Sequence, residues 1–159
     1  DPIVIQYEKG LISSSDFFAN VSSRLELQIN YETFSQAWAE IFSAIPEMEE
    51  ILVELKSQLP VYLISNTNEI HFQYVFKQFP IVQQLNGYVL SYKIGHMKPE
   101  MEIYQEVLRH SGLSAHECLY IDDIKRYVEA ASDHGFHCIH FIDPQQFKEK
   151  LRLFGLSLL

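Results

Sequence analysis

The feature that most constrains this chain is a change of hydrophobic period near residue 60. Up to that point apolar residues recur at helical spacing, and beyond it short apolar runs alternate with helical stretches. Apolar runs of four or five residues are typical of strands buried on both faces, and their alternation with helices indicates a parallel sheet. We therefore predict an α/β fold with strands near 61–65, 88–91, 118–122 and 137–141.

The first third of the chain has a different pattern. Apolar side chains three and four residues apart predict helices over 13–27, 31–44 and 47–58. The charge of the chain changes at nearly the same place. Residues 1–54 hold two basic and ten acidic residues, whereas residues 55–159 hold ten basic and eleven acidic residues. We expect an acidic helical segment followed by an α/β layer.

Composition places the chain among globular proteins, because 47% of its residues are hydrophobic and 21% are charged. No apolar run approaches the roughly 18 residues that a membrane-spanning helix needs, so we expect no membrane partner. The net charge of −9 argues against a nucleic-acid partner, since phosphate backbones attract clustered Lys and Arg. Cys118 and Cys138 lie in apolar runs that favour packed thiols, and we expect a cytoplasmic protein.

Polar side chains follow three of the apolar runs, and the carboxyl ends of parallel strands are where ligands bind in such sheets. Ser65 and Asn66 end the first run, and Lys98 comes a few residues after the second. Asp122 and Asp123 follow the third. A carboxylate pair can hold Mg²⁺ while a lysine and a hydroxyl orient phosphate oxygens. The set therefore indicates phosphoryl chemistry in one crevice.

Each of these residues also has an ordinary structural interpretation. Ser65 or Asn66 could cap the following helix, and Lys98 could be a solvated residue before a proline at a helix start. The acidic pair could lie favourably at a helix N-terminus. Three such coincidences, in chain order and all at strand ends, are harder to explain than one shared site.

The order of these motifs resembles the haloacid dehalogenase superfamily, in particular its phosphatase-like members with a helical cap inserted early in the chain. The matching segments are VYLISNTN at 61–68, KPEMEIYQEVL at 98–108 and YIDDIKRYVEAASDHG at 120–135, with YEKGLISSSDFF at 7–18 resembling the start of the cap. The resemblance implies a helical cap over 1–45 and a Rossmann-like core over 46–159 that lacks its first strand.

The resemblance also implies roles for individual residues. Ser65 takes the place of the hydroxyl in the second motif, Lys98 of the lysine in the third, and Asp122 with Asp123 of the metal-binding pair in the fourth. Catalysis would then involve Ser65 and Lys98, the phosphate would lie against them and Asn66, and Mg²⁺ would bind the aspartates. The implied activity is hydrolysis of a small phosphorylated metabolite through an aspartyl-phosphate.

The chain departs from the family pattern in two places. The first motif, an Asp-x-Asp that ends the first strand and supplies the nucleophile, has no counterpart, because neither Asp1 nor Asp16 follows an apolar strand. We expect the nucleophile upstream and the chain alone to be inactive. A missing segment or another chain would supply a central strand between those ending at Ser65 and Asp122. Tyr127 stands where similar sequences usually carry Asn.

Other interpretations of the same motifs make different predictions. A non-catalytic interaction or regulatory module would have lost the first strand, and the codons upstream of Asp1 distinguish it from an enzyme. A dehalogenase would have no use for a metal-binding acidic pair. A receiver domain is excluded because its acidic pair precedes its hydroxyl and Lys-Pro, whereas here the pair follows them. For an enzyme, the acidic first third favours a small, mostly neutral monophosphate as the substrate.

Overall fold

The computed structural model describes residues 1–156 and confirms the predicted α/β fold. The chain begins with helices α1 (Pro2–Glu8), α2 (Ser14–Leu25), α3 (Tyr31–Ala39) and α4 (Pro46–Gln58). The strands are β1 (Tyr62–Ser65), β2 (Gly87–Leu90), β3 (Leu119–Asp122) and β4 (His137–His140). Between and after them lie α5 (Glu69–Gln78), α6 (Pro80–Gln83), α7 (Ser91–Ile94), α8 (Met101–Ser111), a 3₁₀ turn (Ala115–Glu117), α9 (Lys125–Asp133) and α10 (Pro144–Leu153).

The strands form two separate parallel pairs. β1 pairs with β2 in a register that sets Ser65 opposite Leu90, and β3 pairs with β4 in a register that sets Asp122 opposite His140. Within the described residues, β1 and β3 have no further strand partner. Each of them therefore presents one edge whose N–H and C=O groups lack a ladder partner.

An apolar cavity of about 550 Å³ is lined by residues of both β1 and β3, the two strands that each have one open edge. It is lined by apolar side chains from α4 and both strands, among them Leu52, Leu55, Leu63, Ile64, Leu119 and Ile121. Buried backbone polar groups are paired in the great majority of native structures. The space in which the sequence predicts a central strand is thus bounded by two open strand edges and apolar side chains.

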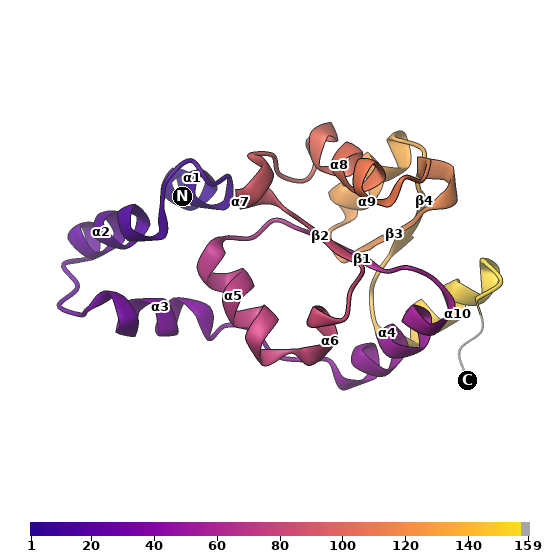
Figure 1. Ribbon diagram of the computed structural model, residues 1–159, viewed down its shortest axis with the longest axis horizontal. Coiled ribbons are helices and arrows are strands. Elements are labelled where there is room, and N and C mark those ends of the chain that lie inside the picture. Colours follow the sequence, from indigo (N-terminus) through magenta and orange to yellow (C-terminus); the bar gives the residue numbers. More distant parts are fainter. Residues whose placement is uncertain (157–159) are drawn as a thin grey trace.

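Helices cover the strands on two sides (Figure 1). On one side α8 and α9 bury Ile103 and Tyr104 against Tyr120 of β3. On the other side α4 and α10 bury Phe147 against Ile139 of β4. Burying one large apolar side chain contributes about 1.5–3 kcal/mol, so these two layers hold the strand pairs in place.

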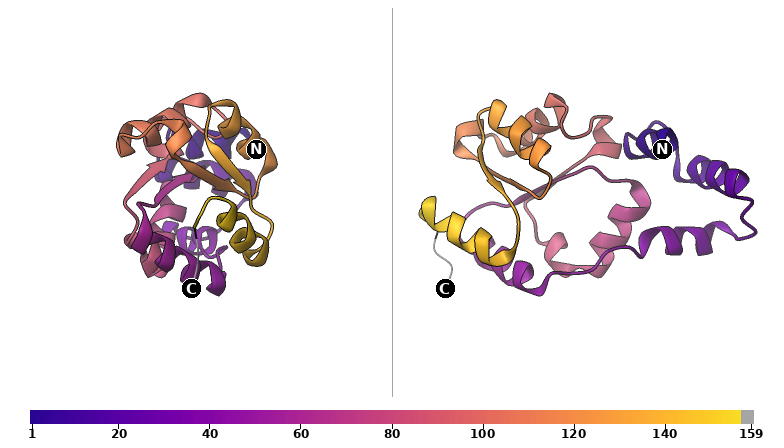
Figure 2. Two further views of the ribbon diagram at one scale, coloured as in Figure 1. Left: turned by 90° about the vertical axis from the view of Figure 1, so that its right-hand side faces the viewer. Right: turned by 180° about the vertical axis from the view of Figure 1, so that it is seen from behind.

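Helices α1, α2 and α3 lie at one end of the molecule (Figure 2), and their aromatic side chains form a buried cluster there. Phe17 is fully buried, stacks on Tyr7 and meets Trp38 edge-on. The Trp38 ring in turn stacks on His71 of α5, with ring centroids 5.6 Å apart. Ile70 of the same helix is also buried in this cluster. The helical segment is therefore packed against the α/β layer through α5.

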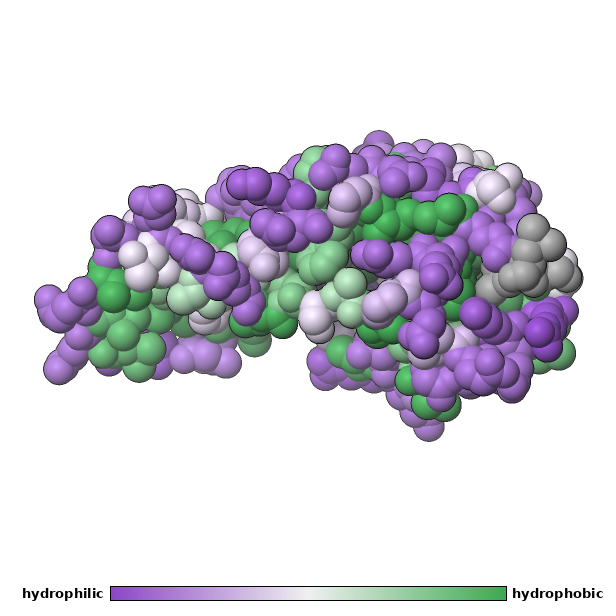
Figure 3. Space-filling model, turned by 90° about the horizontal axis from the view of Figure 1, so that it is seen from below, coloured by the Kyte–Doolittle hydropathy of each residue, from purple (hydrophilic) through white to green (hydrophobic). Residues whose placement is uncertain are grey.

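The helix predicted over 31–44 is shorter in the structure. It ends at Ala39, and the chain turns after Glu40 so that the ring of Phe42 meets His71 edge-on at 5.1 Å. This tertiary contact outweighs the helical spacing of the sequence. Nearby, Leu25 and Ile29 are exposed between α2 and α3, and Figure 3 shows hydrophobic surface at this end.

Gly10 brings the helical end close to the strands. Its φ of +66° lies in the left-handed region, and a Cβ at this position would lie 2.0 Å from the carbonyl oxygen of Tyr92 in α7. The neighbouring Lys9 forms an ion pair with Glu100 at the start of α8. A glycine is required here because the backbone approaches α7 too closely for a side chain.

Candidate active site

The carboxyl ends of β1 and β3 open into a pocket of about 580 Å³. Ser65 is the last residue of β1, and Asp122 is the last residue of β3. Asn66, Lys98 and Asp123 line the same pocket. The parallel strands bring together residues that lie far apart in the sequence, because both strands end at the same side of the fold. All five predicted site residues thus lie at one pocket.

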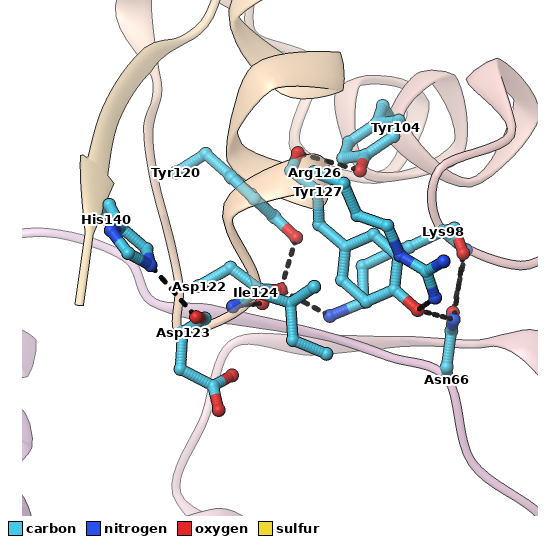
Figure 4. A network of polar contacts seen from close by, with 10 residues as sticks. All are labelled: Asn66, Lys98, Tyr104, Tyr120, Asp122, Asp123, Ile124, Arg126, Tyr127 and His140. Atoms are coloured by element: carbon cyan, nitrogen blue, oxygen red, sulfur yellow. Dashed lines mark hydrogen bonds and ion pairs between the residues drawn. The ribbon is translucent and has the colours of Figure 1, made fainter. Parts of the chain in front are cut away.

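Lys98 and Asp122 form a buried ion pair at the centre of the site (Figure 4). The Lys98 Nζ lies 2.6 Å from Oδ2 of Asp122, and the Tyr120 hydroxyl donates to the same oxygen at 2.6 Å. The Ile124 N–H donates to Oδ1. Burial raises the pKa of the Asp122 carboxyl, but the hydrogen bonds from Lys98 and Tyr120 outweigh it and hold the pKa below its usual value. Asp122 is therefore a carboxylate at neutral pH.

Asn66 fixes the loop that carries Lys98. Its Oδ1 accepts the backbone N–H of Lys98 at 2.7 Å, and its Nδ2 donates to the Lys98 carbonyl at 3.0 Å. The same Nδ2 donates to the Tyr127 hydroxyl at 3.3 Å. The side-chain amide of Asn66 is thus occupied by contacts that join the end of β1 to the Lys98–Pro99 loop, whose peptide bond is cis.

Ser65 and Asp123 supply the polar groups that remain available to a ligand. In the described part of the chain, neither the Ser65 hydroxyl nor the Asp123 carboxylate forms a hydrogen bond or an ion pair with another residue. The Asp123 backbone carbonyl accepts a hydrogen bond from His140 Nε2 at 3.0 Å. Figure 4 shows the Asp123 carboxylate pointing away from the Lys98–Asp122 pair.

Arg126 is a site residue that the sequence analysis missed. Its Nη2 donates to the Tyr127 hydroxyl at 3.0 Å, and its guanidinium lies 4.9 Å from the centroid of the Tyr127 ring. Lys98 Nζ lies 5.0 Å from the same centroid. Arg126 follows the acidic pair closely in the sequence, which was the available signal. The contact with the Tyr127 ring and hydroxyl positions the Arg126 guanidinium in the pocket wall.

The first helix supplies part of the pocket wall through Ile5 and Glu8, and Lys9 directly after it adds to the same wall. Burial raises the pKa of the Glu8 carboxyl above its usual value. Lys9 pairs with Glu100, whereas Arg126 has no carboxylate partner within residues 1–156. Sequence reasoning could not place these α1 residues here, because they are about ninety residues from the loop they meet.

The carboxylates of the pocket fit a hard divalent cation. Asp122 accepts three hydrogen bonds, which leaves about one of the roughly four lone-pair positions of a carboxylate, and Asp123 has all of its own. Mg²⁺ prefers such oxygen ligands together with water and substrate phosphate. A second group, His96, Glu100 and Glu102, places three ligand atoms within 4.8 Å of one another, but Glu100 is already paired with Lys9.

The parallel α/β layer thus carries a hydroxyl, a lysine and an acidic pair at its strand ends. The profile of the haloacid dehalogenase-like hydrolases matches residues 10–141, and the chain belongs to this family.

Curated relatives of the chain are phosphatases. D-ribitol-5-phosphate phosphatase from Bacteroides thetaiotaomicron is 25% identical over 153 residues, which cover 92% of this chain and 74% of the relative. A sesquiterpene phosphatase from Aspergillus oryzae is 28% identical, over 87% of this chain and 71% of its own length. Flavin mononucleotide hydrolase 1 from Arabidopsis thaliana is 24% identical, over 97% of this chain and 62% of its own.

Solved structures share the fold. A haloacid dehalogenase family enzyme from Bacteroides thetaiotaomicron in a magnesium complex superposes with a TM-score of 0.86 at 28% identity, over 96% of this chain and 80% of that one. A structure of the same enzyme with magnesium and inorganic phosphate has a TM-score of 0.80 at 30% identity, over 86% and 73%. No helix in the described residues has the length and apolar character to cross a membrane.

Proposed function

We propose that this chain forms most of a Mg²⁺-dependent phosphomonoesterase that acts on a small phosphorylated metabolite. The observation that carries the proposal is the convergence of Ser65, Lys98 and the acidic pair on one pocket at the ends of two parallel strand pairs. The names of the phosphatase relatives and the magnesium and phosphate bound to a structural neighbour support it.

The nucleophile in this proposal is an aspartate upstream of Asp1, at the end of a strand lying between β1 and β3. Neighbouring strands are about 4.8 Å apart, so one strand between two open edges can pair with both. The apolar lining of the cavity suits a strand buried on both faces. A residue just beyond the end of that strand would reach the pocket between Ser65 and Asp122.

The reaction then proceeds in two displacements. A carboxylate oxygen of the upstream aspartate attacks phosphorus and the ester P–O bond breaks. The second aspartate of the upstream Asp-x-Asp gives its proton to the leaving oxygen, which becomes the free alcohol, and it takes a proton back from the attacking water in the second displacement. Water then attacks the aspartyl-phosphate, its proton is removed, and inorganic phosphate and the carboxylate are released. The chain's own residues hold the phosphoryl group throughout.

The described residues divide this work between them. Lys98 has two ammonium hydrogens beyond the one given to Asp122, and with the Ser65 hydroxyl it binds phosphoryl oxygens. Asn66 keeps the Lys98 loop at the end of β1. Asp122 and Asp123 would hold Mg²⁺, which when bound neutralises charge on the phosphoryl oxygens.

The test is phosphate release by the natural full-length polypeptide from a panel of sugar phosphates, bisphosphates and nucleotides, with Mg²⁺ or with a chelator. We expect Mg²⁺-dependent hydrolysis that favours small monophosphates. Lys98→Met should lower kcat/KM by about 10²-fold or more, since it removes a preorganised donor to the phosphoryl group. Lys93→Met is the matched control, because Lys93 lies against Phe72 and Tyr92 outside the pocket and should leave kcat/KM unchanged.

The non-catalytic module makes the opposite prediction. Codons upstream of Asp1 would then encode no apolar strand ending in Asp-x-Asp, and the full-length polypeptide would release no phosphate from any member of the panel. Either an active full-length protein unaffected by Lys98→Met or this inactive outcome would contradict the proposed function.

A further inference from the structure

The buried phenol of Tyr127 has a donor that its protein contacts do not use. Asn66 Oδ1 accepts the Lys98 N–H, which identifies the other end of this amide as the nitrogen that donates to Tyr127. The guanidinium of Arg126 can only donate, and it donates to the same phenol oxygen. Both lone pairs of the Tyr127 oxygen are therefore occupied, and its own hydrogen must point elsewhere.

No acceptor for that hydrogen is present among the described residues. The Tyr127 oxygen has two hydrogen-bond partners in residues 1–156, Asn66 and Arg126, and both are donors. Tyr127 is only 6% exposed, yet it lines the pocket with Ser65 and Lys98. A buried hydroxyl without an acceptor is costly, so an oxygen that enters the pocket, from water or from a ligand, would complete its hydrogen bonding.

The charges around the phenol select an anionic acceptor. Lys98 Nζ and the Arg126 guanidinium lie 5.0 and 4.9 Å from the Tyr127 ring centroid. Lys98 is already paired with Asp122, whereas Arg126 has no carboxylate partner within residues 1–156, so its guanidinium favours a negatively charged oxygen over a neutral one. We propose that the Tyr127 hydroxyl donates a hydrogen bond to an oxygen of the phosphoryl group, as a substrate-binding residue. The identity of the anion rests on the proposed function, whereas the need for an acceptor rests on the contacts of the phenol.

The test is binding of inorganic phosphate to the full-length polypeptide with Mg²⁺, measured by calorimetry. Tyr127→Phe keeps the ring against both cations and removes only the hydroxyl, and we expect it to weaken phosphate binding about tenfold, as for a hydrogen bond to a charged group. Tyr88→Phe is the matched control, because the Tyr88 hydroxyl donates to the Val82 carbonyl outside the pocket. Its phosphate affinity should stay within twofold of wild type.

A second variant keeps the inference falsifiable if Tyr127→Phe folds poorly. Arg126 is exposed, so Arg126→Met should fold normally. This change removes one of the two donors to the Tyr127 oxygen, so the hydroxyl hydrogen is no longer held toward the pocket. We expect it to weaken phosphate binding, and to do so less in a Tyr127→Phe background, because both changes act on the same hydrogen bond.

The outcomes separate this inference from the proposed function. Unchanged phosphate affinity in Tyr127→Phe, or an Arg126→Met effect of the same size with and without the hydroxyl, overturns the inference even if the protein is an active phosphatase. A full-length protein that binds phosphate through Tyr127 but hydrolyses no phosphoester overturns the proposed function and supports the inference. Absence of phosphate binding by wild type overturns the inference as well.

Discussion

At the scale of single residues, the contacts of Asp122 set the chemistry of the pocket. Its carboxylate accepts from Lys98, Tyr120 and the backbone of Ile124, and its side chain is only 5% exposed. Removing one partner of such a buried pair typically costs about 3–5 kcal/mol, because the other charge is left unpaired. A change to either residue therefore affects the stability of the protein as well as the chemistry of the pocket, and the stability of each variant is measured beside its activity.

The depressed pKa of Asp122 predicts an acid-sensitive stability. The folded protein keeps this carboxyl ionised below 3.8, the usual value, so its contribution is fully present above that pH and is lost as pH falls through the lower folded pKa. Urea unfolding between pH 5 and pH 2 measures this loss. Asp122→Asn should be less stable than wild type at pH 5 and lose less stability on acidification.

Asp133→Asn is the control for this measurement. Asp133 is an exposed carboxylate at the end of α9, and its replacement should leave the acid dependence unchanged. If Asp122→Asn and wild type lose the same free energy of unfolding on acidification, the Lys98 and Tyr120 contacts do not stabilise the charge.

Part of the candidate site could be predicted from the sequence. Ser65, Lys98 and the acidic pair were found because polar residues at strand ends meet at one edge of a parallel sheet. Their roles stay predictions until variants are measured. Arg126 and Glu8 could not be found in this way. The position of Arg126 depends on the Tyr127 ring, and that of Glu8 on the packing of α1 against a loop about ninety residues away, and local sequence spacing contains no information on either.

At the scale of elements, no backbone ladder connects the two strand pairs in the described residues, so side-chain packing sets their relative position. No ladder joins β1 to β3, and an apolar cavity of about 550 Å³ separates them. The strands themselves were predictable to within one residue at each end from their apolar runs. The end of α3 was not, because the contact of Phe42 with His71 redirects the chain.

The open edges predict rapid hydrogen exchange in the strands of the 159-residue chain alone. Peptides covering β1 and β3 should exchange much faster in this chain than in the full-length polypeptide, by about 10²-fold or more, because a central strand would pair their amides. Mass spectrometry measures both. Peptides from α8, whose amides bond within the helix, are the internal reference. Equal protection of β1 and β3 in both proteins would show that no strand pairs there.

At the scale of the whole molecule, the helical end and the strands meet at Gly10 and Lys9. The Gly10 backbone contacts the Tyr92 carbonyl, and the Lys9–Glu100 pair lies at the pocket rim beside it. A shift of α1 would therefore move Glu8 and Lys9 relative to the pocket.

Gly10→Ala is predicted to destabilise the protein by about 2 kcal/mol or more. The left-handed φ costs about 1 kcal/mol for a residue with a side chain, and the contact at 2.0 Å forces the backbone of α7 or α1 to move. Gly112→Ala measures the cost of the left-handed φ without the cost of the close contact, because Gly112 has a φ of +70° and no atom lies within 4 Å of the added Cβ. Urea denaturation of both variants is the measurement, and equal losses would show that the Tyr92 contact carries no energy.

The stacking of Trp38 on His71 gives the protein an optical reporter. Trp38 is the single tryptophan of the sequence, and its buried indole N–H has no hydrogen-bond partner within the described residues. Burial lowers the pKa of His71, although its bond to the Trp38 carbonyl opposes this, so the stacked imidazole is neutral at pH 7. Tryptophan fluorescence, excited at wavelengths where the nine tyrosines do not absorb, therefore arises from one defined position between α3 and α5. A change in emission reports movement of the helical end without any label.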